Sequence, residues 1–155
     1  MENRKIKTLL LRLLGAGIIG VGAALYLINM PHWDVKKAKT DLKIDAAALI
    51  ARYQADAVAA NQYFLSEDGN SHVLDVSGIL LDLSTDYAGN TQLRMGTAHS
   101  EIYILVSLQA GETVTRTQVG SPVRIKGAIT SGAEFDADFG AYSPITISEG
   151  IILKP

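Results

Sequence analysis

The chain has few residues in patterns that perform catalysis or bind metals. Its three histidines, His32, His72 and His99, are scattered, and none has a partner at the spacing of a metal site. It contains no cysteine, which excludes disulfides, thiolate ligands and a cysteine nucleophile. The P-loop, dinucleotide-binding and nucleophile-elbow motifs are also missing. We therefore expect no enzyme, no metal and no cofactor.

The densest group of carboxylates is in the stretch EFDADFG, which holds Glu134, Asp136 and Asp138. Alternate carboxylates are the ligands that calcium prefers in an EF-hand loop. Such a loop starting at Asp136 would need glycine at position 141 and a carboxylate at position 147. Ala141 and Ile147 stand there instead. The pattern therefore predicts an exposed acidic loop and not a calcium site.

Charge is divided unevenly along the chain. Residues 1–12 hold four basic side chains and one acidic side chain, whereas the remaining residues hold ten basic and fifteen acidic ones. Proteins that bind nucleic acid need a basic face, because much of their affinity comes from neutralising phosphates. The acidic balance after residue 12 means that nucleic acid is not the expected partner.

The N-terminal region resembles a membrane anchor. Leu9–Met30 is uncharged except for Arg12, and as a helix it would be about 33 Å long, enough for a hydrocarbon core of about 30 Å if Arg12 reaches the interface. Trp33 suits the far interface, and Pro31 would end the helix. We predict a transmembrane anchor over residues 1–30, in contact with the bilayer through residues 9–30. A cleaved signal peptide and a buried helix are the alternatives.

Two further expectations concern this anchor. Ala16, Gly20 and Ala24 are spaced by four, which forms a small-residue face suited to pairing two helices in a homodimer. Four basic residues flank the apolar run on each side, but the first cluster abuts it, so we favour an N-terminus inside the cell. The predicted location is the bacterial inner (cytoplasmic) membrane, single-pass, with the C-terminal domain in the periplasm or otherwise outside the cytoplasm.

The folded part begins with a helix. Residues 31–44 read as a juxtamembrane linker or a strand-like arm, and residues 45–155 as the folded domain. Within 45–64 the spacing predicts one helix, with Asp45 as its N-cap. Its apolar residues share one face: Leu49, Tyr53, Ala57, Ala60 and Phe64. This face should pack against a sheet.

Five strands are expected after the helix, at 73–83, 91–98, 101–108, 122–130 and 144–155. Gly78 and Gly127 fall inside the first and fourth of them. Glycine inside a strand often marks a bulge or a sharp bend at a barrel corner. We therefore predict a mainly β fold with one preceding helix, built as a five-stranded OB-type Greek-key barrel. An SH3-like barrel is the main competitor.

Several stretches together resemble a known family. They are PHWD (31–34), AANQYF (59–64), VLDVSGIL (73–80) and VGSPVRIKGAIT (119–130), and the chain is similar to the tRNA_anti-like family of bacterial OB-fold proteins. The resemblance implies a membrane-anchored OB fold of a kind typical of Bacteroidetes. The family has no set of catalytic residues, so the resemblance implies none in this chain. The chain departs from the family pattern at SEDGNSH (66–72), which separates the helix from the first strand.

The expected barrel suggests where a ligand would bind. OB barrels bind on the face of their second and third strands, flanked by two loops, which here would be 82–90 and 131–143. The candidate ligand-binding residues are Tyr87, Arg94, Tyr103, Phe135, Phe139 and Tyr142. Acidic and aromatic groups around a groove suit a protein, a basic peptide or a glycan better than a phosphate.

Two functions are compatible with these sequence features. The first is a membrane-anchored OB-fold binding module that recognises a protein, peptide or glycan in the cell envelope. The alternative is a membrane-tethered OB protein that binds single-stranded nucleic acid. The basic residues that could serve the alternative are Arg94, Arg116, Arg124 and Lys126.

Overall fold

The structure is a computed structural model that describes residues 34–66, 71–114 and 117–153. The chain divides into two compact units, Met1–Trp33 and Asp34–Pro155. The expected anchor at residues 9–30, with Ala16, Gly20 and Ala24, lies outside the described residues. Among the residues that are described, no helix has the length and apolar character needed to cross a membrane.

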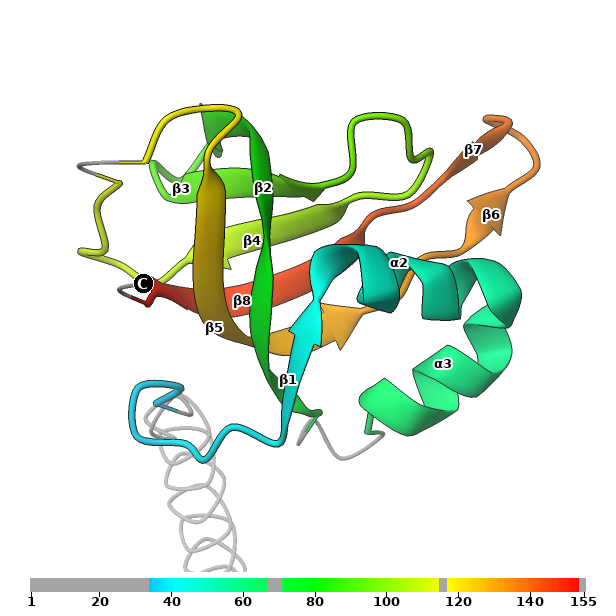
Figure 1. The fold of residues 1–155 in the computed structure, drawn as a ribbon, viewed down its shortest axis with the longest axis horizontal. Coiled ribbons are helices and arrows are strands. Elements are labelled where there is room, and N and C mark those ends of the chain that lie inside the picture. Colours follow the sequence, from blue (N-terminus) through cyan, green and yellow to red (C-terminus); the bar gives the residue numbers. More distant parts are fainter. Residues whose placement is uncertain (1–33, 67–70, 115–116, 154–155) are drawn as a thin grey trace, which may run out of the picture. The chain divides into compact units, whose positions relative to one another are not determined.

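The described part consists of two helices and eight strands (Figure 1). In chain order these are β1 (Leu42–Asp45), α2 (Ala46–Ala55), α3 (Ala57–Phe64), β2 (Val73–Thr85), β3 (Thr91–Gly96), β4 (Ile104–Leu108), β5 (Pro122–Ser131), β6 (Phe135–Asp136), β7 (Ala141–Tyr142) and β8 (Ile145–Ile152). The two helices lie together beside the sheet, and β6 and β7 form a separate small hairpin.

Five of the strands close into a barrel. Their order is β2-β3-β4-β8-β5, and β5 pairs back with β2. The pairs are antiparallel except for β4 and β8, which run parallel. The predicted mainly β fold with a closed five-stranded barrel is therefore confirmed. The strand order is consistent with an OB-type barrel.

Strand β2 closes the barrel by changing partners along its length. Val73–Ile79 pairs with β5, and Ile79–Thr85 pairs with β3. The register shifts between Leu80 and Asp82, so the irregularity comes just after Gly78. At Gly78 itself, an added Cβ would lie 2.7 Å from the Cβ of Ala46. The glycine therefore lets the first turn of α2 pack directly on β2.

The prediction of one helix before the barrel was wrong, because the helical region breaks at Asp56. Asp56 is extended (φ −160°, ψ 96°), and its side chain accepts a hydrogen bond from the backbone N–H of Ala59. Aspartate favours such N-cap bonds over a helix interior, so it ends α2 and starts α3. Asp45 caps α2 as predicted, accepting from the N–H of Ala47 at 2.8 Å.

The expected apolar face of the helical region packs into the core. Leu49, Tyr53, Ala60 and Phe64 are buried, and Ala57 is partly buried against the same cluster. Ile50, next to Leu49 in the sequence, is also buried and widens this face. Inward residues of the barrel complete the cluster, among them Leu74, Val76, Leu93, Met95, Ile104 and Ile147. The helices therefore extend the barrel core on one side.

The segment before α2 is part of the fold. Of the two interpretations given to residues 31–44, a linker or a strand-like arm, the structure places a strand at Leu42–Asp45, parallel to β2. We call residues 34–41 the arm. The side chain of Val35 is fully buried against Val73 and Ala128, and Lys126 donates to the backbone oxygen of Ala38 at 2.5 Å. The arm is thus packed on the outer face of β2 and β5.

Tyr53 makes the stability of the fold sensitive to alkaline pH. Its hydroxyl is buried without a hydrogen-bond partner in the described part, and burial raises its pKa to about 12. The neutral hydroxyl is favoured in the folded state, so the contribution of Tyr53 to stability is complete below its unfolded pKa, near 10. That contribution is lost as the pH rises towards the folded pKa of about 12.

Tyr53→Phe is therefore expected to flatten the fall in stability above pH 10. At neutral pH the same change should leave stability equal or higher, because it removes a buried hydroxyl without a partner. Urea unfolding at pH 7.5, 10 and 11.5 measures both effects. The exposed Tyr63→Phe is the matched control. An unchanged alkaline slope in Tyr53→Phe would contradict the assignment.

Candidate functional site

The predicted recognition surface is the face of the second and third barrel strands, which are β3 and β4, and β8 extends this surface on one side. Along β3, Leu93 and Met95 point into the core, so Arg94 points outward and is exposed. On β4 the buried Ile104 and Val106 leave Leu105 on the outer face. Arg94 pairs with Leu105, and Leu105 pairs with Thr146 of β8. The three strands thus present one continuous surface.

Two of the predicted site residues contact each other on this surface. The guanidinium carbon of Arg94 lies 4.1 Å from the ring centroid of Tyr103, which is a cation–π arrangement. Across the sheet, Asp82 of β2 is the strand partner of Arg94. Because Arg94 stays exposed while its position is fixed by the ring, it can still donate hydrogen bonds to a ligand.

A second pair of predicted residues meets on the hairpin formed by β6 and β7, which replaces the long loop expected at 131–143 (Figure 1). The rings of Phe135 and Tyr142 are 5.1 Å apart, edge to face. Asp136 accepts hydrogen bonds from the N–H groups of Asp138 and Phe139 and so shapes the turn. Phe135 and Phe139 remain 53% and 84% exposed. The acidic stretch is thus a folded hairpin that displays aromatic rings.

The hairpin and the Arg94–Tyr103 pair lie at the same end of the barrel. The N–H of Ile145, the first residue of β8, donates to the carbonyl oxygen of Tyr103, and Tyr142 is three residues earlier. Five of the six predicted residues are therefore brought to one end. In the described ranges, no group of three His, Asp or Glu side chains there or elsewhere could hold a metal ion.

Tyr87 is separated from the other five. It is fully exposed in the loop between β2 and β3, which leads into Thr91. The start of β3 lies beside the end of β4, since Gln92 pairs with Ser107. Hydrogen bonds from Asn90 and, to a lesser extent, from Ala88 and Gly89 lower the pKa of Asp86 in this loop. The loop that carries Tyr87 thus lies at the opposite end of β3 from the hairpin.

The basic residues named for a nucleic-acid surface are mostly engaged elsewhere. Arg124 forms a bidentate ion pair with the buried Asp75, with N–O distances of 2.7 and 2.6 Å, and this pairing raises the pKa of Arg124. Lys126 is nearly buried and donates to backbone oxygens of the arm. Arg116 lies outside the described residues. Arg94 alone of the three described residues is displayed on the predicted face.

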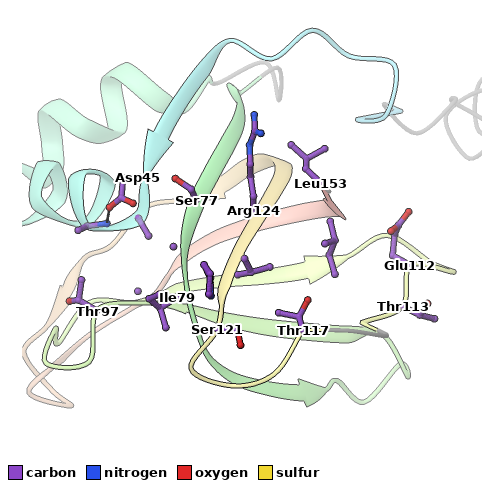
Figure 2. Close-up of a pocket in the computed structure, with 17 residues that line it drawn as sticks. Asp45, Ser77, Ile79, Thr97, Glu112, Thr113, Thr117, Ser121, Arg124 and Leu153 are labelled. Carbon is purple, nitrogen blue, oxygen red and sulfur yellow. Dashed lines mark hydrogen bonds between the residues drawn. The ribbon is translucent and has the colours of Figure 1, made fainter. Parts of the chain in front are cut away.

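One concavity of the described part was not predicted from the sequence. We call it the mid-barrel groove, a cavity of about 1200 Å³ around the middle of β2. Figure 2 shows Asp45 and Thr97 at one end, Glu112 and Thr113 at the other, and Ile79 and Ser121 between them. The elements that line it are the start of α2, the middle of β2, the start of β5 with its preceding loop, and the ends of β3 and β8.

One sequence signal could have indicated this groove. Ile79 lies on the same outward side of β2 as Ser77, yet it is apolar and 40% exposed. An isolated exposed apolar residue is common on protein surfaces and carries little information alone. The groove lies where β2 pairs in turn with β1, β3 and β5, and that pairing is a property of the tertiary fold.

Comparisons with known proteins add no family assignment. No protein-family model matches the chain, and no curated protein matches it significantly.

Proposed function

We propose that this protein is a membrane-anchored, OB-type binding module without catalytic activity, which recognises a protein, peptide or glycan in the cell envelope. The observation that carries the proposal is the grouping of exposed aromatic residues on the β6–β7 hairpin beside the Arg94–Tyr103 pair. The closed five-stranded barrel is compatible with an OB-fold binding module. Kinship with the tRNA_anti-like family is part of the same proposal and rests on the stretches quoted above.

The chemistry of this surface favours a ligand without phosphates. Glu134 and Asp138 lie on the hairpin with Phe135 and Phe139, and all four are exposed. Carboxylates repel phosphate groups, whereas they attract basic side chains and accept hydrogen bonds from sugar hydroxyls. Aromatic rings supply a large contact area at a low entropy cost. A glycan or a protein segment therefore fits this surface better than a single-stranded nucleic acid.

Binding can be tested with the full chain in detergent micelles and three probes: a lysine-rich peptide, a neutral oligosaccharide and an oligothymidine. We expect one of the first two to bind, and Phe139→Ala to weaken that binding by about tenfold, as for the loss of an exposed aromatic anchor. Titration calorimetry at low and physiological salt measures both. Val58→Ala, at an exposed apolar position on α3, is the matched control.

Each outcome of this experiment has a distinct meaning. Binding of oligothymidine alone, with a steep salt dependence, would replace the proposal with the nucleic-acid alternative. Binding that is unaffected by Phe139→Ala would place the ligand away from the hairpin and contradict the proposed surface.

The membrane anchor and its orientation need a separate test. The apolar length of residues 9–30 and the basic cluster before it support a single span with an N-terminus inside the cell. A C-terminal reporter that is active only in the cytoplasm should then stay silent in a bacterial host. A strong reporter signal would contradict the proposed orientation. Recovery of the protein in the soluble fraction would contradict the proposed membrane anchor.

A further inference from the structure

We propose that the mid-barrel groove is a second binding site, which takes an extended, uncharged peptide segment of a partner protein. The part concerned is the half nearer α2, formed by Asp45–Ala47, Ser77–Ile79, Thr97, Ser121 and Pro122. We call it the α2 half of the groove. It is distinct from the outer face of β3, β4 and β8, so it does not rest on the function proposed above.

The shape of the site favours an elongated ligand. A smaller hollow of about 300 Å³ runs along α2, lined by residues that include Ile50, Gln54 and Ser100. Ala47 and Thr97 line both this hollow and the groove, so the two adjoin each other. The resulting track passes from the side of α2, over the middle of β2, to the start of β5. A chain several residues long can follow such a track, whereas a compact metabolite would fill only a part of it.

The site offers few charges to a ligand. Asp45 is the single Asp, Glu, Lys or Arg that lines the α2 half in the described part, and its carboxylate accepts from the N–H of Ala47 as the helix cap. Arg124, at the edge of the groove, is held by both oxygens of Asp75. Among its described residues the α2 half thus holds one exposed carboxylate and no cation, which cannot offset the desolvation of a ligand that carries several charges.

The remaining side chains suit a peptide. The hydroxyls of Ser77, Thr97 and Ser121 take part in no side-chain hydrogen bond within the described residues, so they can pair with backbone N–H and C=O groups. Ile79 and Pro122, which are both exposed, supply aliphatic surface between them. No Phe, Tyr or Trp of the described chain lines the track, so it lacks the stacking platform that nucleobases and sugars use. An uncharged peptide segment fits both features.

A differential selection tests the proposal. The full chain is immobilised in neutral nanodiscs and challenged at pH 7.5 with a library of random decapeptides. The same library is selected against Ser77→Tyr and Thr97→Tyr, in which an exposed residue is enlarged to block the track. We expect the wild-type protein to enrich peptides that lack charged residues, and each blocking variant to bind them at least tenfold more weakly.

The matched control is Thr85→Tyr, the same enlargement at an exposed position of β2 outside the groove. It should bind the selected peptides as the wild type does, and thermal melting should show that all variants fold. Selected peptides rich in charged residues would overturn the proposal, as would a lack of enrichment over Ser77→Tyr. Phe139→Ala should not weaken the binding of these peptides. Failure of the groove proposal can therefore be distinguished from failure of the proposal for the hairpin surface.

Discussion

Gly127→Ala is expected to destabilise the protein by about 3 kcal/mol, which is a large effect for one added methyl group. A Cβ at Gly127 would overlap the Cγ2 of Ile147 and lie 3.1 Å from the backbone oxygen of Ser148. Both neighbours belong to β8, whose pairing with β5 closes the barrel. The strain would therefore fall on the seam between these strands. Urea unfolding followed by circular dichroism measures the loss.

The cause can be separated from the general cost of replacing glycine. Gly89→Ala meets no atom within 4 Å, and its positive φ of 85° should cost only about 1 kcal/mol. In a double-mutant cycle, Ile147→Ala removes the overlapping methyl group, so the two changes together should cost less than the sum of their separate effects. Strict additivity would show that the contact with Ile147 is not the cause.

Asp75→Ala is expected to cost about 3 kcal/mol, because it breaks the bidentate pair with Arg124 inside the fold. Asp75 is 5% exposed, and its strand partner on β5 is the nearly buried Lys126. The loss would leave two cations close together without a carboxylate. The side chain of Arg124 is 40% exposed, which keeps the expected cost at the lower end for a broken buried pair.

The matched control is Asp82→Ala on the same strand. Asp82 is exposed and forms no ion pair in the described part, so its removal should change stability by less than about 0.5 kcal/mol. Chemical unfolding of both variants at pH 7 gives the comparison. Equal effects of the two substitutions would mean that the Asp75–Arg124 pair contributes nothing beyond a surface contact.

The strands of the barrel could be predicted because their patterns are local. Alternating apolar residues such as Ile104 and Val106 identify β4 directly, and Asp45 marks the start of α2 as an N-cap. The break at Asp56 could not be predicted with the same certainty. Continuous apolar spacing from Leu49 to Phe64 favours one helix, and only the local competition of the Asp56 side chain for a backbone N–H divides it.

The candidate sites were less predictable, since they depend on contacts between distant segments. Arg94 and Tyr103 could each be named as candidates from the sequence, but their contact depends on the pairing of β3 with β4. The engagement of Arg124 by Asp75 joins residues 49 positions apart. The groove is likewise lined by segments that are distant in the sequence, among them β2, the start of β5 and the end of β3.

The packed arm has a mechanical consequence. Asp41 and Val73 are joined twice, by the N–H of Asp41 to the carbonyl oxygen of Val73 and by the N–H of Val73 to the carboxylate of Asp41. Beyond this joint, β1 runs parallel to β2. A pull on residue 34 would thus load β2 and β5 in shear through the arm instead of unravelling a loop. Tension from the N-terminal side would reach the start of β2 before it reached the outer face of β3 and β4.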